Sequence, residues 1–179
     1  FITDANDIIV GVVDSGIDYN HEDLAANMWI NESELNGDPN IDDDENGFVD
    51  DFYSADFFHN DSDPMDTLGH GTHVAGTIGA VGNNNKGVVG ICWNVKIMVL
   101  RCLDALGVGT TANLIRAIEY ADAKGAHVIN CSWGGPAYSR AEEDAINASA
   151  AVVVCAAGNE RNDNDSLPFY PANYDCDNI

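Results

Sequence analysis

Short runs of apolar residues recur along the chain, at positions 8–13, 95–100, 127–131 and 151–156. Each run is rich in Val and Ile and does not alternate with polar residues, which is typical of strands buried on both faces of a parallel sheet. Three segments between or after these runs predict helices, at residues 70–81, 111–124 and 140–149. Strands that alternate with helices predict an α/β fold: a three-layer αβα sandwich around a mostly parallel, doubly wound sheet.

Small and polar residues follow the predicted strands. Asp14 follows the first strand, Ser132 the third and Gly158 the fourth. In doubly wound sheets ligands bind at the carboxyl ends of the strands. We therefore expect a functional site at this edge of the sheet.

Two segments do not fit the pattern of core elements. Residues 31–66 form a long, acidic, turn-rich insertion, and residues 161–179 are polar and contain no closing element. We expect both segments to lie outside the core. Residues 1–179 are long enough for one domain with a substantial core, and we expect this domain to be incomplete at its C-terminus.

The net charge of the chain limits the classes of partner that it can bind. Seven Lys and Arg face 30 Asp and Glu, which gives a net charge of -23. Such a surface repels nucleic acid and anionic membranes, and it favours bound cations. The sequence shows neither a membrane-spanning run nor a signal peptide. Four of the five cysteines lie in apolar runs and are expected to be inert core thiols, whereas disulfide pairing does not follow from the sequence.

Three motifs combine residues that carry chemistry: DSGID at 14–18, GHGTHVAG at 69–76 and AAGNE at 156–160. An Asp at the end of a buried strand needs a hydrogen-bond donor, and a His between two glycines at a helix start leaves one ring face open. A carboxylate that binds one ring nitrogen leaves the other free to take a proton. An Asn in a tight turn after a strand can stabilise an oxyanion.

In this order and spacing, the three motifs resemble those of the subtilisin-like (subtilase) serine proteases, over nearly the whole chain. The resemblance implies that Asp14 is the orienting acid, His70 the general base and Asn159 the oxyanion donor of an Asp-His-Ser triad site. It also implies that His73 is structural.

The same resemblance implies a substrate groove. Two segments would pair with an extended peptide on its two sides: Ser132, Trp133 and Gly134 on one side, and Gly107, Val108 and Gly109 on the other. Ala157 and Gly158 would complete the groove next to the oxyanion site. Trp133 departs from the aliphatic residue that is common at its position, and it either narrows the apolar subsites or simply packs against the pocket wall.

The nucleophile of the family is absent. None of the eight serines lies in a Gly-Thr-Ser-Met-Ala-type motif. We therefore expect residues 1–179 to be the N-terminal part of a subtilisin-like catalytic domain, truncated before the serine. The parent protein is expected to be a serine endopeptidase that forms an acyl-enzyme, and the fragment is expected to be inactive. The alternative is a catalytically dead, calcium-dependent binding fragment.

Two loops predict structural calcium. The first, DDDENG at 42–47, matches the start of a calcium loop, and some subtilases carry a similar loop here. Because Tyr53 stands where an EF-hand has Glu, the loop is not an EF-hand. Its candidate ligands are Asp42, Asp44, Asn46, Phe48 through its carbonyl, Asp50 and Asp51. The alternative is a solvated acidic loop.

The second loop, residues 82–88, resembles the strong calcium loop of the family. The resemblance implies ligands from Asp23, Gly82, Asn84, Lys86 and Val88. The alternative is an Asn-rich turn.

The resemblance further implies polypeptide substrates, an inhibitory prodomain, a monomeric state and a secreted or extracellular location. A nucleotide-binding α/β enzyme is a weaker alternative, because the DSGID turn supplies no Gly-rich phosphate motif. An adhesion module built on the acidic loop accounts for one loop and no strands.

Overall fold

The computed structural model describes residues 4–179, and these contain a parallel sheet in the order β2-β1-β3-β4. The strands are β1 (Asp4–Asp14), β2 (Asn94–Arg101), β3 (Val128–Cys131) and β4 (Val152–Cys155). All four coincide with the predicted apolar runs. Because the order places β1 in the middle and returns to β3 on its other side, the sheet is doubly wound, as expected.

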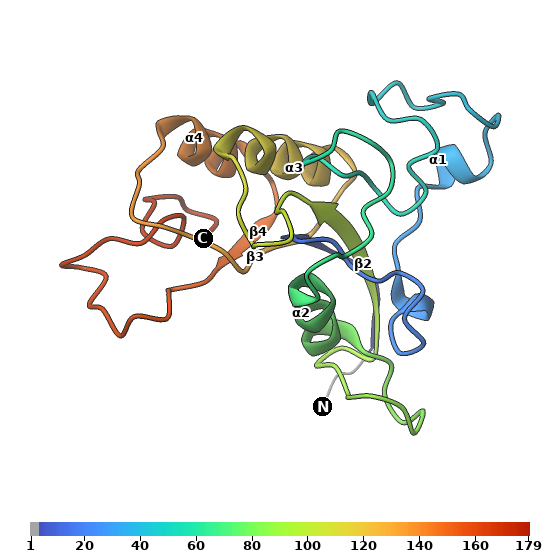
Figure 1. The fold of residues 1–179 in the computed structure, drawn as a ribbon, viewed down its shortest axis with the longest axis horizontal. Helices are drawn as coiled ribbons and strands as arrows, with labels where there is room; N and C mark the ends of the chain where they lie inside the picture. Colours follow the sequence, from blue (N-terminus) through green and yellow to red (C-terminus); the bar gives the residue numbers. More distant parts are fainter. Residues whose placement is uncertain (1–3) are drawn as a thin grey trace.

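Three helices pack on this sheet: α2 (His70–Gly79), α3 (Thr111–Ala123) and α4 (Arg140–Ala148). The helices α3 and α4 lie on one face of the sheet and α2 lies on the other (Figure 1). The three-layer α/β architecture is therefore confirmed. A short helix α1 (Glu32–Leu35) and a 3₁₀ turn η1 (Ala25–Asn27), which the pattern does not predict, complete the described elements.

Each face of the sheet has its own apolar core. Side chains of β1, β2 and β3, among them Leu100 and Ile129, pack with Leu114 and Ile118 of α3. On the opposite face, alternate strand residues such as Val12 pack against α2. This division follows from the two-residue alternation of side chains along a strand.

One region of the sheet is open, which differs from the prediction that every strand is buried on both faces. On β4, Val153 is 1% exposed, whereas Val152 and Val154 are 54% and 50% exposed. Helix α2 contacts β1 and β2, and within residues 4–179 no helix covers the same face of β4. The continuous run of valines in β4 is typical of a strand that is buried on both faces. Among the described residues, however, only one face of β4 is covered.

The acidic segment 31–66 contributes to the core, contrary to expectation. Phe48 and Phe57 are almost fully buried and pack edge-to-face on each other and on Tyr120 of α3. The guanidinium of Arg116 lies over both phenylalanine rings. Aromatic residues within an acidic run thus attach the segment to α3, and Glu34, Asp51 and Asp56 of the same segment are also buried.

No helix among the described residues is long and apolar enough to cross a membrane. Within the same residues all five cysteines are free, and Cys102 and Cys131 are buried. Burial raises the pKa of the Cys102 thiol, whereas a hydrogen bond with Cys155, together with burial, raises the pKa of the Cys131 thiol. These two agree with the expected core thiols, whereas Cys92 and Cys155 are only half-buried.

Replacing Ile129 by Ala in the full-length protein should lower the free energy of unfolding by about 2–5 kcal/mol, because the side chain is fully buried between β1 and α3 and leaves a cavity. Ile41→Ala is the matched control, because Ile41 is 51% exposed and its truncation should change stability by less than about 0.5 kcal/mol. Denaturant unfolding of both variants measures the difference. Equal losses would contradict the assignment of the core.

Candidate active site

A fully buried carboxylate, that of Asp14, lies at the carboxyl end of the central strand β1. Its Oδ1 accepts hydrogen bonds from the backbone N–H of Ser15 and from Nδ1 of His70, both at 2.7 Å. Because an ionised carboxylate only accepts, the proton of this contact is on Nδ1, and Nε2 of His70 is left as an acceptor. The His70 side chain is 49% exposed, so Nε2 is accessible from outside.

Two glycines allow α2 to start this close to β1. A Cβ on Gly71 would lie 2.1 Å from the carbonyl oxygen of Gly16, and a Cβ on Gly16 would lie 2.4 Å from that of Pro64. Gly16 also has a φ of 102°, which side-chain-bearing residues rarely adopt. The glycines of the DSGID and GHGTHVAG motifs therefore set the distance between Asp14 and His70.

Asp66 holds the first turn of α2, a role that the motifs do not indicate. The helix starts after Gly69, which has no side chain to act as an N-cap. Instead, Oδ1 of Asp66 accepts from the backbone N–H groups of Leu68 and Gly69, and Oδ2 accepts from the N–H and hydroxyl of Thr72. Although burial alone raises it, these hydrogen bonds hold the pKa of Asp66 below its usual value.

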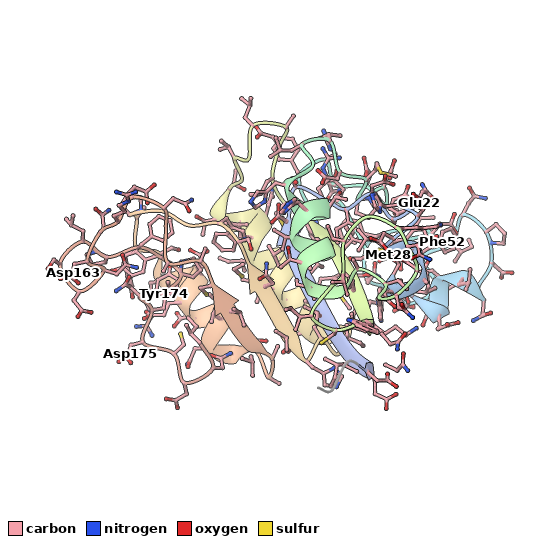
Figure 2. The ribbon with its side chains drawn as sticks, turned by 90° about the horizontal axis from the view of Figure 1, so that it is seen from below. Glu22, Met28, Phe52, Asp163, Tyr174 and Asp175 are labelled. Carbon is pink, nitrogen blue, oxygen red and sulfur yellow. The ribbon has the colours of Figure 1, made fainter. Side chains whose placement is uncertain are left out.

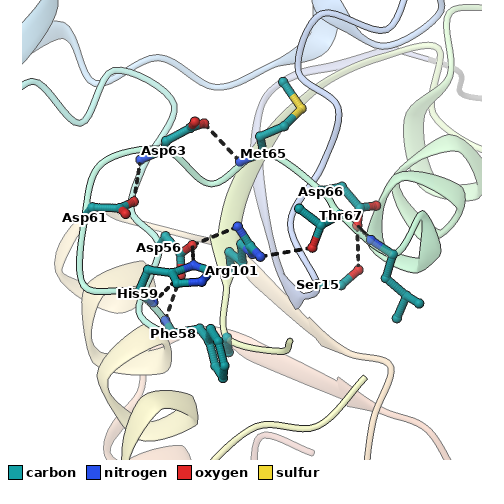
Figure 3. Close-up of polar contacts among 12 residues, drawn as sticks. Ser15, Asp56, Phe58, His59, Asp61, Asp63, Met65, Asp66, Thr67 and Arg101 are labelled. Atoms are coloured by element: carbon teal, nitrogen blue, oxygen red, sulfur yellow. Dashed lines mark hydrogen bonds and ion pairs between the residues drawn. The ribbon is translucent and has the colours of Figure 1, made fainter. Parts of the chain in front are cut away.

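Ser15 connects this cap to the Asp14 strand. Its hydroxyl donates to Oδ1 of Asp66 at 2.9 Å and accepts from the N–H of Gly71 at 3.1 Å. Figure 3 shows this contact between Ser15 and Asp66. The residue after Asp14 therefore bonds to the residue after His70, which fixes the two motifs relative to each other. The signal in the sequence was a carboxylate a few residues before a capless helix start.

A buried ion pair lies next to this network. Arg101, the register partner of Asp14 on β2, binds Oδ2 of Asp56 at 2.9 Å and the hydroxyl of Thr67 at 3.0 Å (Figure 3). His59 also contacts Asp56, through Nδ1. Because Asp56 and Thr67 flank the end of the acidic segment, Arg101 ties that segment to the strand next to Asp14.

The remaining predicted site residues also follow strands at the carboxyl edge. Ala157, Gly158 and Asn159 follow β4 after one intervening residue, and all three are exposed. Gly158 has a φ of 95°, and the backbone N–H of Asn159 donates to the carboxylate of Glu160. The side-chain amide of Asn159 forms no hydrogen bond with the described residues.

The two predicted groove segments line one pocket. Gly107, Val108 and Gly109 follow β2, whereas Trp133 and Gly134 follow β3, and all five line a pocket of about 340 Å³. Ser132 lies just before them, and its hydroxyl accepts from the side-chain amide of Asn130. Asp104 shapes the first segment, because its carboxylate accepts from the N–H groups of Leu106 and Val108, and these bonds lower its pKa.

Only part of the first predicted calcium loop converges. Carboxylate oxygens of Asp44, Asp51 and Glu34 lie within 4.8 Å of one another, and Glu34 was not among the predicted ligands. Oδ2 of Asp44 contacts Lys124, while its buried Oδ1 has no partner among the described residues. Burial raises the pKa of Asp51, although hydrogen bonds from Tyr120, Asn31 and Asn46 oppose this rise.

Other predicted ligands of this loop form hydrogen bonds or apolar contacts within the protein instead. Asp42 accepts from the N–H groups of Asn46 and Gly47, and Asp50 accepts from the N–H of Asn40. The side chain of Asn46 donates to Asp51. Phe48 places its ring in the core.

The second predicted loop closes around Asp23. This buried carboxylate accepts from the side-chain amide of Asn84 at 2.7 Å and from the N–H of Val88 at 3.0 Å. The amide of Asn84 is the main cause of the lowered pKa of Asp23. Gly82 and Lys86 lie in the same turn, and the N–H of Lys86 donates to Oδ1 of Asn84.

Chemically, the geometry describes a histidine whose ring is oriented by a buried acid and whose second nitrogen is available. Such a pair acts as a general base toward a hydroxyl or thiol. Within residues 4–179 no serine forms a hydrogen bond with His70.

Comparisons with known proteins all point to the same family. A model of the Subtilase family matches residues 5–178. Subtilisin-like protease 1 of Plasmodium falciparum (isolate 3D7) is 47% identical over 128 residues, which are 72% of this chain and 19% of that protein. The Plasmodium vivax protein of the same name is 41% identical over 160 residues, or 88% and 25%. A Thermophilic serine proteinase of Bacillus sp. (strain AK1) is 38% identical over 169 residues, or 93% and 36%. The chain thus spans about a fifth to a third of the relatives it matches.

Replacing Asp66 by Asn should lower the stability of the full-length protein at pH 7 by about 1 kcal/mol, the typical loss for a helix N-cap. Because the folded pKa of Asp66 lies below its usual value, its contribution is present above that value and is lost as the pH falls through the folded pKa. The difference between Asp66→Asn and the parent should therefore narrow from pH 7 toward pH 3.

Denaturant unfolding at several pH values measures this narrowing. Asp165→Asn is the matched control, because Asp165 is exposed in the loop after β4 and its replacement should have little effect at any pH. A deficit of Asp66→Asn that stays constant with pH would contradict a role of the ionised carboxylate.

Proposed function

The chain belongs to the subtilase family, and we propose that the protein of which it is part is a serine endopeptidase that hydrolyses peptide bonds through an acyl-enzyme. The observation that carries this proposal is the 2.7 Å hydrogen bond between the buried Asp14 and Nδ1 of the half-exposed His70. The names of the relatives, subtilisin-like protease and serine proteinase, support the same reaction class.

Each residue has one role in this proposal. Asp14 fixes the tautomer and orientation of His70, and His70 takes the proton of a serine hydroxyl through Nε2. The same nitrogen then returns the proton to the leaving amine. Asn159 donates its side-chain amide to the oxyanion of the tetrahedral intermediate. The segments 107–109 and 132–134 hold the peptide between them by main-chain hydrogen bonds.

We propose that the nucleophilic serine comes from residues outside this chain and that these residues cover the open face of the sheet. Val152 and Val154 of β4 are 54% and 50% exposed, on the face of the sheet where α2 packs against β1 and β2. An apolar surface of this kind is usually covered in a folded protein. A segment that packs there lies next to α2, whose first residue is His70.

We also propose that the cluster of Glu34, Asp44 and Asp51 holds a structural calcium ion. Hard carboxylate oxygens suit Ca²⁺, and the buried, unpartnered Oδ1 of Asp44 is an acceptor that the described residues do not use. A second ion would be bound around Asp23 with oxygens of Gly82, Asn84, Lys86 and Val88. Either ion would offset the crowding of negative charge in its loop.

An organophosphonate probe for serine proteases should label the full-length protein, and His70→Ala should slow labelling by about 10²–10⁴-fold, because the serine loses its base. His127→Ala is the control: this exposed histidine precedes β3 at the opposite edge of the sheet and should label at the parent rate. No labelling of the intact, calcium-loaded protein would refute the peptidase proposal and favour a catalytically dead binding protein.

Removing calcium with a chelator should lower the melting temperature of the full-length protein by several degrees. Calcium at a hundredfold excess over its dissociation constant stabilises a fold by about 2.7 kcal/mol. Asp51→Asn should reduce this calcium-dependent shift, because Asp51 belongs to the cluster, whereas Asp38→Asn, at an exposed position of the same segment, should keep it. Identical melting curves with and without chelator would exclude structural calcium.

A further inference from the structure

The pocket between the two groove segments has a mixed apolar and polar lining. Leu103, Val108, Leu114 and Pro136 belong to its apolar lining, and Glu142 of α4 is its one carboxylate among the described residues. A peptide held between the segments presents side chains alternately to the two sides, so one of them enters this pocket. The chemistry of Glu142 therefore bears on which side chain fits.

The carboxylate of Glu142 is buried and only half satisfied. The residue is 5% exposed, and Oε2 accepts a hydrogen bond from the hydroxyl of Tyr174 at 2.7 Å. Oε1 is buried and has no partner among residues 4–179. Burial raises the pKa of this carboxyl, although the Tyr174 hydroxyl opposes the rise. Tyr174, labelled in Figure 2, comes from the segment after β4.

The side chain of Glu142 does not form the hydrogen bond that its place in the helix cap predicts. Ser139 caps α4 by accepting from the N–H of Glu142, and this spacing is typical of a capping box in which the glutamate bonds back to the serine N–H. Here that N–H donates to the Tyr174 hydroxyl instead. Tyr174 thus replaces the glutamate in the cap and leaves Oε1 of Glu142 for other partners.

A second residue of the pocket lining, Trp133, also has a buried polar atom without a partner among the described residues. Nε1 of Trp133, the residue that departs from the aliphatic pattern, is buried and has no acceptor among the described residues. An unpaired buried donor or acceptor costs about 1–3 kcal/mol. The lining of the pocket therefore combines an unused acceptor, Glu142, with an unused donor, Trp133.

We propose that Glu142 is a specificity-determining residue, and that this pocket selects a substrate side chain carrying a hydrogen-bond donor, best matched by a hydroxyl or carboxamide. This inference rests on the proposed peptidase function. A hydroxyl or carboxamide offers a donor that matches Glu142 and an acceptor that matches Trp133. An apolar side chain of the same shape leaves both unpaired, and a site with unpaired polar groups discriminates strongly against such an analogue.

The test uses the full-length protein and peptides that differ at one position at a time upstream of the cleaved bond. Thr and Val form a pair of equal shape, and Gln and Met form a longer pair. At one position the donor-bearing residue should be preferred by about tenfold in kcat/KM. Glu142→Leu should remove or reverse this preference, whereas Glu142→Gln, which keeps an acceptor oxygen, should retain part of it. Glu119→Leu, at an exposed position of α3, is the control.

A third pair, Lys and Met, separates the charged from the neutral match. A preference for Lys that is lost in Glu142→Leu also supports donor recognition and identifies Glu142 as ionised in the complex. Equal cleavage of all pairs, or a preference that Glu142→Leu leaves unchanged, would overturn the inference while the peptidase proposal stands. Absence of any cleavage together with absence of phosphonate labelling would overturn both.

Discussion

The burial of the Asp14 carboxylate is the constraint on which the site depends. A buried charge needs hydrogen-bond donors, and the structure gives Asp14 two, the Ser15 N–H and His70 Nδ1. His70 reaches it only because α2 begins against the end of β1. That approach in turn requires glycine at position 71 and the cap that Asp66 provides. Ser15 and Asp66 are therefore as much a part of the arrangement as the acid and base themselves.

Contacts within the chain compensate part of its excess of negative charge. Two of the few basic residues bind acidic partners of segment 31–66: Arg101 pairs with Asp56, and Lys124 contacts Asp44. Phe48 and Phe57 attach the same segment to α3. The segment is thus fixed by two cations and two aromatic rings, and several of its carboxylates accept backbone N–H groups, as Asp42 and Glu34 do. This fixed frame is what brings Glu34, Asp44 and Asp51 together.

The sequence predicted the four strands, the three longer helices and the Asp14–His70 pair. The spacing of hydrophobic residues and the glycine-flanked motifs that indicate them are local signals. It did not predict Asp66, Glu34 or Glu142, because their roles depend on contacts that local patterns do not encode. A carboxylate four residues before His70 has many equivalents in so acidic a chain. Likewise, the valines of β4 predicted two-sided burial, but a strand pattern does not say which element covers each face.

The open face and the half-exposed histidine have a common explanation. Val152 and Val154 expose apolar surface on the side of the sheet where α2 lies, and His70 begins that helix. Exposed valines favour a packing partner, whereas an oriented histidine with a free nitrogen favours a proton donor. We propose that one segment packed on this face meets both needs, because α2, which begins at His70, lies on the same face of the sheet. Hydrophobic burial would then place the nucleophile, and the hydrogen bond to Asp14 would set the direction in which its proton leaves.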